Sequence, residues 1–229
     1  MHSRTTICLL TIHDGGGKMK GPLGELALKN KKRYCDLHGY AFFHETVILD
    51  KERPAPWSKL LSIQQLLLNP HCGWVFYIDA DTFITNTLVT LESIIGPDRK
   101  EDIIFSSDMV AIVNTGVILI KRSPFSIVFL TRVYGHCEFH THGWWEQAAI
   151  NFMLQQESAQ NRSEVAILHQ RVMNSCWPYF GGAECGWHRG DFVVHFAGTP
   201  SATEEGIKHQ WNIPEWLEQN RGLVDTATL

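Results

Sequence analysis

Apolar and polar positions along the chain alternate in blocks that predict a series of strands and helices. Thr5–Ile12 is β-branched and apolar and stops at a polar, glycine-rich run, which predicts a buried strand that enters a loop. In Leu23–His38 apolar residues recur on one side and basic residues on the other, which predicts an amphipathic helix that ends at Gly39. Trp57–Leu68 has the same helical spacing.

The alternation continues to about residue 196. Trp74–Ala80 is predicted to be a strand, because its apolar run is typical of a strand buried on both faces of a parallel sheet. Further predicted strands are Ala41–Leu49, Asp102–Ser106, Gly116–Ile120, Val165–Leu168 and Phe192–Phe196, and further helices are Leu88–Ile95, Phe125–Tyr134 and Trp144–Gln156. Strands that alternate with helices predict an α/β fold with a mainly parallel central sheet flanked by helices. We expect a single domain over residues 1–229, with 199–229 as a C-terminal tail or lid.

Composition narrows the classes of partner. The chain has 229 residues, of which 44% are hydrophobic and 19% charged, as in a globular protein with a sizeable core. Its 20 basic and 24 acidic residues give a net charge of −4, which argues against binding to nucleic acid or to an anionic membrane. No apolar stretch approaches the roughly 18 residues of a transmembrane helix, so none is predicted.

The six cysteines contain no CxxC pair, which excludes a zinc ribbon and a thioredoxin-like motif. Three disulfides are permitted, but a domain of this size does not need them. We therefore expect the cysteines to be buried free thiols. Free thiols favour a cytoplasmic protein. Because the chain begins at its first predicted strand, a domain of a Golgi-lumen protein is the alternative.

Two acidic residues, Asp79 and Asp81, lie where the central apolar strand ends. In open α/β sheets ligands bind outside the carboxyl ends of the strands, and residues i and i+2 of a strand face the same way. We therefore expect the two carboxylates to share one task. Because close carboxylates repel each other, a divalent cation such as Mg²⁺ or Mn²⁺ is the expected partner. Helix capping or an Asx-turn is the alternative.

The segments around this motif carry a family resemblance. They are Tyr34–Tyr40, Trp57–Leu60, Trp74–Asn86, Asn114–Val117, Glu146–Ala148, Met173–Ser175 and Asp191–Gly198. In this order they resemble the nucleotide-sugar glycosyltransferases of the GT-A fold, and specifically glycosyltransferase family 34, which contains galactosyl-, mannosyl- and xylosyltransferases. The resemblance covers the chain from about Thr5 to Gly198, and family 8, with glycogenin-like enzymes, is the nearest neighbouring family.

The resemblance implies that His195 is the third metal ligand, beside Asp79 and Asp81. Imidazole binds Mn²⁺ better than Mg²⁺, so manganese is favoured. The cation bridges the diphosphate of the donor in such enzymes and stabilises the departing nucleoside diphosphate. No metal role is expected for the other histidines. A loop carries three of them, His136, His140 and His142, without the cysteine or carboxylate spacing of a zinc site.

The resemblance implies that the donor is a nucleotide diphosphate sugar, with UDP-galactose as the first choice from family habit. The donor-binding residues implied by the resemblance are Thr11, Ile12, His13, Lys59, Ala80, Asn114, Gly116, Gly198 and Lys208. The run Gly15-Gly16-Gly17 either lets backbone amides approach phosphate or is a flexible turn, and both interpretations stay open. Relatives often carry a basic residue soon after the His-Phe-x-Gly stretch, where this chain has Thr199, Pro200 and Ser201. Either Lys208 folds back to make that contact or the contact is absent, and we expect the segment around Lys208 to form a lid.

The catalytic residues implied by the resemblance are Glu146, Gln147 and Asp108. Asp108 and Asn114 match positions that hold hydroxyl groups of the donor sugar, and Glu146-Gln147 lies near the anomeric carbon. The family retains anomeric configuration, through either a covalent glycosyl-enzyme or front-face substitution. We favour the front-face route, because Gln147 is a poor nucleophile and Glu146 lies on a different helical azimuth.

The predicted function is therefore a metal-dependent, retaining hexosyl- or pentosyltransferase that acts on a glycan or another hydroxyl acceptor. Two other functions are considered. A sugar nucleotidyltransferase usually has a basic, glycine-rich first loop, which His13–Lys18 fits poorly. The second is a non-catalytic carbohydrate-binding relative. The presence of the expected site residues argues against it: Asp79, Asp81, His195 and Gln147. Trp144, Trp145, Trp177 and Trp187 are candidates for stacking on sugar rings.

Overall fold

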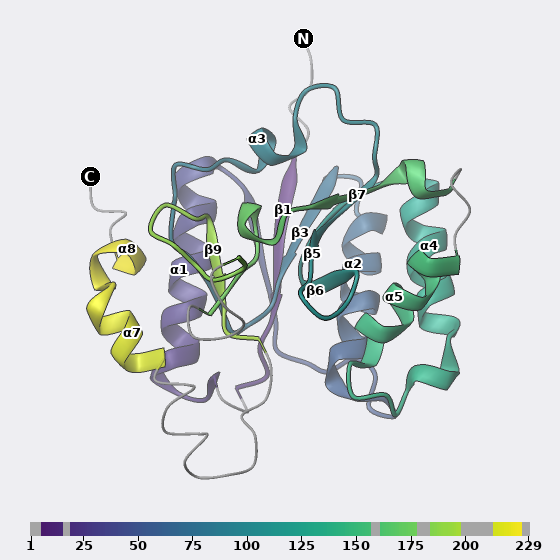
Figure 1. Cartoon of the computed structure of the whole chain (residues 1–229), viewed down its shortest axis with the longest axis horizontal. Helices are drawn as coiled ribbons and strands as arrows, with labels where there is room; N and C mark the ends of the chain where they lie inside the picture. The colour runs from purple at the N-terminus through teal and green to yellow at the C-terminus, as the bar shows by residue number, and fades with distance from the viewer. Residues whose placement is uncertain (1–5, 16–18, 157–160, 178–183, 198–212, 226–229) are drawn as a thin grey trace.

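A computed structural model gives the structure of the chain and describes residues 6–15, 19–156, 161–177, 184–197 and 213–225. At its centre is a six-stranded sheet with the order β2-β1-β3-β6-β5-β7 (Figure 1). Its strands are β1 (Ile7–Ile12), β2 (Ala41–Glu45), β3 (Trp74–Ile78), β5 (Ile103–Ser107), β6 (Val113–Lys121) and β7 (Val165–Leu168). The pairs β1–β2, β1–β3 and β5–β7 are parallel, and β6 is antiparallel to both β3 and β5.

Helices cover both faces of this sheet (Figure 1). They are α1 (Pro22–His38), α2 (Ser58–Leu68), α3 (Leu91–Ile95), α4 (Pro124–Gly135) and α5 (Trp145–Gln156). Strand alternation decides which helices each side chain meets. In β3, Val75 and Tyr77 pack in the cluster that holds residues of α2, α4 and α5, whereas Phe76 and Ile78 pack with residues of α1 and α3.

The prediction of a mainly parallel sheet flanked by helices is confirmed. The apolar run of β3 indicated parallel neighbours, and β3 is parallel to β1 but antiparallel to β6. Most predicted boundaries fall within a few residues of the observed ones. The largest differences are β2, which ends at Glu45 instead of Leu49, and α3, which begins only at Leu91 because the Thr90 side chain caps it.

A second, three-stranded sheet has the order β4-β9-β8. Its strands are β4 (Thr82–Ile84), β8 (Ser175–Cys176) and β9 (Val193–His195). The predicted strand Phe192–Phe196 is therefore present, but in this smaller sheet. The other two strands were not predicted, because three and two residues show no readable alternation.

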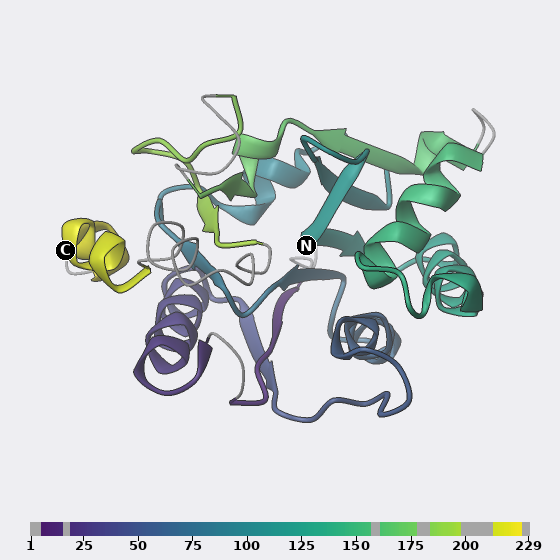
Figure 2. The same ribbon diagram turned by 60° about the horizontal axis from the view of Figure 1, so that its bottom comes forward.

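The C-terminal helices α7 (Ile213–Gln219) and α8 (Arg221–Asp225) lie beside α1 (Figures 1 and 2). Trp216 and Leu217 of α7 join one apolar cluster with Ala27 of α1 and Phe196. Part of the predicted tail is therefore helical and packed. The lid proposed around Lys208 lies outside the described residues.

Two disulfides join Cys8 to Cys72 and Cys176 to Cys185, while Cys35 and Cys137 are free. The prediction of free thiols is wrong for the four paired residues. Parallel pairing of β1 with β3 brings Cys8 near Cys72, a juxtaposition that spacing along the chain does not reveal. The cysteines therefore give no argument for a cytoplasmic enzyme. No helix in the described ranges is both long and apolar enough to cross a membrane.

Candidate functional site

Asp79, Asp81 and His195 form a cluster whose possible ligand atoms all lie within 4.8 Å of one another. His195 Nε2 lies 3.4 Å from Asp81 Oδ1 and 3.8 Å from Asp79 Oδ2. Two carboxylates and one imidazole suit Mn²⁺, and fit Mg²⁺ less well because of the nitrogen. The structure thus brings together the three residues predicted as metal ligands, from segments more than a hundred residues apart in the sequence.

A turn and a strand pairing assemble the cluster. Because β3 ends at Ile78, strand alternation does not place Asp81, and that part of the sequence argument is wrong. The chain turns instead, with the Thr82 hydroxyl donating to the Asp79 carbonyl at 2.6 Å. The antiparallel register of β4 and β9 then sets Thr82 opposite His195, and the Phe196 amide donates to the Asp81 carbonyl at 3.0 Å.

Gly116 of β6 makes room for the imidazole ring. A Cβ atom on Gly116 would lie 2.1 Å from His195 Cε1 and 2.7 Å from Nδ1, distances that no side chain tolerates. The family resemblance placed Gly116 among the donor-binding residues. In the structure the close neighbour is the histidine ring, so Gly116 shapes the candidate metal site.

Lys59 and Glu146 form a buried network of charged groups next to the cluster of Asp79, Asp81 and His195. The ammonium Nζ of Lys59 lies 3.2 Å from Asp79 Oδ1 and 2.9 Å from Glu146 Oε1, and it donates to the Thr115 carbonyl at 3.3 Å. The Tyr77 hydroxyl donates to the same Asp79 oxygen at 2.5 Å. Burial lowers the pKa of Lys59, but the Asp79 and Glu146 carboxylates outweigh burial and raise it above its usual range. Lys59 therefore stays charged and holds one oxygen of a candidate metal ligand.

Glu146 and Gln147 both reach Thr115 from the first turn of α5. The Thr115 hydroxyl donates to Glu146 Oε1 at 2.9 Å, and the Thr115 amide donates to Gln147 Oε1 at 3.0 Å. Glu146 is only 2% exposed, and burial raises its pKa against the opposing effect of Lys59. Just before them, Trp145 adopts a left-handed backbone with φ of 45°, a conformation that is strained for a bulky residue.

Asp108 and Asn114 lie next to each other at one side of the site. Asn114 Nδ2 donates to Asp108 Oδ2 at 3.0 Å, and Asp108 Oδ1 accepts from the Val110 amide at 2.8 Å. Asp108 is half-buried, whereas Val110 and Met109 beside it are exposed. The two residues predicted to hold a donor sugar thus share one hydrogen bond.

The side chains at the end of β1, which were predicted to bind the nucleotide, contact other parts of the protein. Thr11 is fully buried, and Ile12 packs against the core. His13 accepts from the Gly15 amide at Nδ1 and donates from Nε2 to the Met19 carbonyl, so its ring closes the loop after β1. The Ala80 side chain is half-buried. Gly16, Gly17, Gly198 and Lys208 lie outside the described residues.

Sequence reasoning missed one lysine at the site. Lys31 is fully buried, and its ammonium donates to the carbonyls of Ala80 and Thr82 at 3.1 and 2.8 Å. The prediction that the basic residues of this helix face away from the core is wrong here. Its spacing from Ala27 and Tyr34, which are both buried, was the available signal.

The four tryptophans proposed for sugar stacking differ in environment. Trp177 is 5% exposed and packs against Phe196, with 4.6 Å between ring centroids. Trp187 packs edge-on against Trp216. Trp145 is half-buried against the core, and Trp144 is 44% exposed. Trp177 is therefore a core residue, and Trp144 is the most open of the four.

A sequence profile of the galactosyl transferase GMA12/MNN10 family matches residues 3–105 and 97–205. The chain is 26% identical over 234 residues to "Probable alpha-1,2-galactosyltransferase gmh2" of Schizosaccharomyces pombe, covering 84% of this chain and 66% of that protein. It is 29% identical over 145 residues to "Xyloglucan 6-xylosyltransferase 4" of Arabidopsis thaliana, covering 57% and 27%. The chain thus matches between about a quarter and two thirds of the length of these relatives.

Two solved structures share the fold. One is a glycosyltransferase involved in the glycosylation of the major capsid of PBCV-1, with a TM-score of 0.66, 16% identity, and coverage of 89% of this chain and 99% of that one. The other is the glycosyltransferase GlyE of Streptococcus pneumoniae TIGR4, with a TM-score of 0.60, 10% identity, and coverage of 97% and 63%. At these identities the likeness concerns the fold alone.

Proposed function

Because the chain belongs to the galactosyl transferase GMA12/MNN10 family and has the GT-A glycosyltransferase fold, we propose that it uses a nucleotide diphosphate sugar to glycosylate a hydroxyl group. The acceptor is a glycan or another hydroxyl compound. The relatives named as galactosyl- and xylosyltransferases support a hexose or a pentose as the transferred sugar, with UDP-galactose as the first donor to test. The observation that carries the proposal is the cluster of Asp79, Asp81 and His195 above the Lys59–Glu146 pair.

The metal in this proposal is Mn²⁺ or Mg²⁺, held by Asp79, Asp81 and His195. When bound, the cation neutralises the donor diphosphate and stabilises the nucleoside diphosphate that leaves. The donor set supports this assignment, because it joins two hard oxygen ligands to one imidazole. Lys59 and Tyr77 both contact Asp79 Oδ1, so they orient this carboxylate and leave Oδ2 toward His195.

The geometry around α5 bears on how configuration is retained. A covalent route needs a carboxylate that reaches the anomeric carbon. The carboxylate that α5 carries is that of Glu146, but this side chain is buried and paired with Lys59. Gln147 is half-buried, and Thr115 fixes its carboxamide through the oxygen. We therefore favour front-face substitution, in which the departing diphosphate takes the acceptor proton and the protein supplies position and charge.

A donor screen tests the activity. The chain is incubated with UDP- and GDP-sugars and Mn²⁺, and release of nucleoside diphosphate is measured. We expect release with one or a few donors, and release that depends on the metal. If no donor is hydrolysed or transferred while sugars still bind, the chain is a carbohydrate-binding relative instead. Formation of a nucleotide sugar from a sugar phosphate and a nucleoside triphosphate would identify a nucleotidyltransferase.

A second experiment tests the metal ligands. Asp81→Ala removes one carboxylate from the cluster, and we expect it to abolish Mn²⁺-dependent nucleotide binding while the circular dichroism spectrum stays unchanged. Asp36→Ala on the exposed side of α1 is the matched control, because among the described residues its carboxylate forms an ion pair with Lys32 alone, at the surface. Equal nucleotide affinity in the two variants would contradict the metal assignment.

A further inference from the structure

A chain of side-chain amides runs from the candidate metal site into β6. His195 Nδ1 lies 2.9 Å from Asn174 Oδ1, and Asn174 Nδ2 lies 2.9 Å from Asn114 Oδ1. Asn114 Oδ1 also accepts from the backbone amide of Gly116 at 2.9 Å. Asn174 is fully buried, and His195 and Asn114 are 5% and 9% exposed. These contacts are therefore shielded from water, where a misplaced donor or acceptor is costly.

The groups around Asn114 show which atom donates and which accepts in each hydrogen bond of this side-chain series. A backbone amide only donates, so the Asn114 atom that faces Gly116 is the carbonyl oxygen. The opposite atom of Asn114 faces the Asp108 carboxylate, which accepts when ionised, and this independently makes it the NH₂ group. The Asn174 atom against the Asn114 oxygen is then its NH₂ group, and the Asn174 atom against His195 is its oxygen.

The same reasoning fixes the histidine tautomer. Since Asn174 presents an oxygen, His195 must carry its hydrogen on Nδ1, and the lone pair of the neutral ring then lies on Nε2. Nε2 is the atom that faces Asp79 and Asp81. Metal-binding histidines commonly have their second nitrogen held in this way by a carbonyl or carboxylate oxygen.

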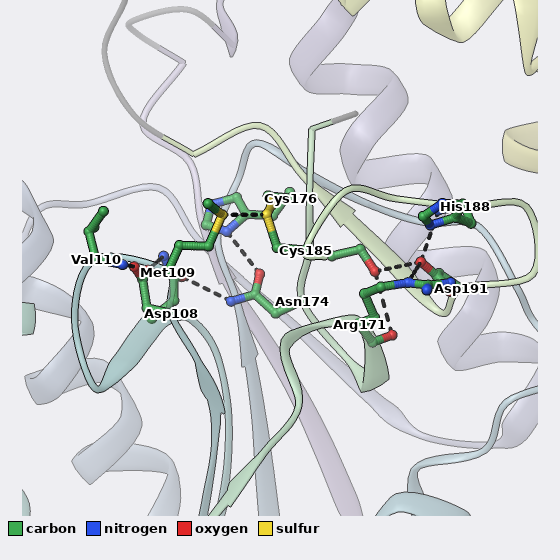
Figure 3. Close-up of a disulfide and its surroundings, with 12 residues drawn as sticks. Asp108, Met109, Val110, Arg171, Asn174, Cys176, Cys185, His188 and Asp191 are labelled. Carbon is green, nitrogen blue, oxygen red and sulfur yellow. Dashed lines mark hydrogen bonds and ion pairs between the residues drawn. A yellow bond between two sulfur atoms is a disulfide. The ribbon is translucent and has the colours of Figure 1, made fainter. Parts of the chain in front are cut away.

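Asn174 is itself held firmly. Its backbone amide donates to the Gln170 carbonyl at 2.9 Å. The next residue, Ser175, donates its hydroxyl to Asp191 at 3.0 Å, and Arg171 holds Asp191 through two nitrogens at 3.0 and 2.9 Å. Figure 3 shows Asn174 between Asp108 and this Arg171–Asp191 pair, close to the Cys176–Cys185 disulfide. The oxygen of Asn174 therefore has little freedom to leave His195.

We propose that Asn174 is a positioning residue for the metal. Asn114 and the Gly116 amide fix the orientation of the Asn174 side-chain amide. The Asn174 oxygen then accepts from His195 Nδ1–H and keeps Nε2 directed at the two aspartates. The proposal rests on the metal role given above, but the tautomer is a property of the metal-free chain. It can therefore be tested without metal, donor or activity.

The first test is long-range ¹H–¹⁵N NMR of the ¹⁵N-labelled metal-free chain at about pH 8.5, roughly two units above the reference pKa of histidine. His195→Gln identifies the His195 signals. We expect a pure Nδ1–H pattern for His195 in the wild type and a mixture of tautomers in Asn174→Ala. An Nε2–H or mixed pattern in the wild type would overturn the proposal.

The second test is direct Mn²⁺ binding, measured by electron paramagnetic resonance of the free ion. We expect Asn174→Ala to raise the Kd about 10- to 100-fold, the usual effect of losing such a partner. Asn86→Ala is the matched control. Its amide donates to the Gly190 carbonyl near the same small sheet, without a hydrogen bond to His195.

Wild-type affinity in a folded Asn174→Ala variant would overturn the positioning role while leaving the proposed function intact. No Mn²⁺ binding by the wild type, with the Nδ1–H tautomer present, would instead overturn the metal proposed above and with it the metal role of Asn174. A loss of affinity in Asn86→Ala equal to that in Asn174→Ala would attribute the effect to the small sheet and overturn the proposal.

Discussion

Lys59 Nζ lies 2.9 Å from Glu146 Oε1, and both side chains are almost completely buried, at 4% and 2% exposure. The same ammonium group contacts Asp79, so a single lysine stands between the helix α5 and a candidate metal ligand. A buried charge pair of this kind is costly to break, because the remaining charge has no water to solvate it. The pair therefore links the stability of the fold to the geometry of the site.

Replacing Lys59 should destabilise the protein strongly. Lys59→Met leaves the buried Glu146 carboxyl without its counter-charge, so the core must hold an unpaired charge or Glu146 must take up a proton. We expect the free energy of unfolding to fall by about 3–5 kcal/mol in urea denaturation. Lys59→Met combined with Glu146→Gln should recover most of the loss, since the stranded charge is gone. Lys32→Met, which removes an exposed pair with Asp36, should cost at most about 1 kcal/mol. Equal losses at Lys59 and Lys32 would contradict the prediction.

Adding one methyl group at Gly116 should damage the candidate metal site. In Gly116→Ala the new Cβ collides with the His195 ring, so the imidazole must move away from Asp79 and Asp81. We expect Mn²⁺ affinity to fall at least tenfold and stability to fall by about 1–3 kcal/mol, the usual cost of overpacking. Gly135→Ala is the control, because no atom lies within 4 Å of its Cβ position. Unchanged Mn²⁺ affinity in a folded Gly116→Ala protein would count against the site.

Lys31 should make stability depend on pH in the alkaline range. Burial lowers its pKa from 10.5 to about 7, although Asp81 and Asp79 oppose the shift. Between about pH 7 and 10 the unfolded chain therefore binds a proton that the folded chain has released, so folding becomes more favourable as pH rises. Relative to Lys31→Met, the metal-free wild type should gain up to about 1.4 kcal/mol per pH unit in this window.

The control for this measurement is Lys29→Met, on the exposed face of the same helix. The difference in the free energy of unfolding between Lys29→Met and the wild type should stay constant across the pH range. Urea unfolding in the presence of a chelator gives both curves. A flat difference between wild type and Lys31→Met would mean that Lys31 remains charged in the folded protein.

Disulfides should contribute measurably to stability. The Cys8–Cys72 bond spans 64 residues, and loss of a loop constraint of that length corresponds to about 4 kcal/mol in the chain-entropy estimate. We therefore expect Cys8→Ala with Cys72→Ala to unfold at markedly lower urea concentration, whereas Cys137→Ala, at an exposed free thiol, should not. Thiol titration of the denatured, unreduced chain should find two free cysteines. Six would show that neither bond forms.

The sequence carried the order of elements because that information is local. The apolar run Trp74–Ile78 and the helical spacing of Leu23–His38 reflect which neighbours along the chain share a face, and both elements form within one or two residues of their predicted bounds. The Asp79–Asp81 motif and its resemblance to a family also pointed to His195, and the structure places the three together.

Hydrogen-bond partners from distant segments were beyond sequence reasoning. Lys31 was assigned to the outer face of its helix because charged residues are usually solvated. Only the structure supplies the Ala80 and Thr82 carbonyls that let it be buried. Cys8 and Cys72 likewise gave no pairing signal, since their bond depends on β1 lying beside β3.

By itself, the sequence therefore determined the class of fold and the Asp79–Asp81 pair, since both depend on residue type and local spacing. The family and the candidate ligand His195 followed from the resemblance of its ordered motifs. Tertiary structure alone decided how those ligands are held: the antiparallel direction of β6, the opposition of Thr82 and His195, and the hydrogen-bond chain through Asn174. The reason is physical. Strand register and the direction of a hydrogen bond depend on residues that are far apart in the sequence and meet only in the folded protein. The residues adjacent in the sequence do not identify those partners.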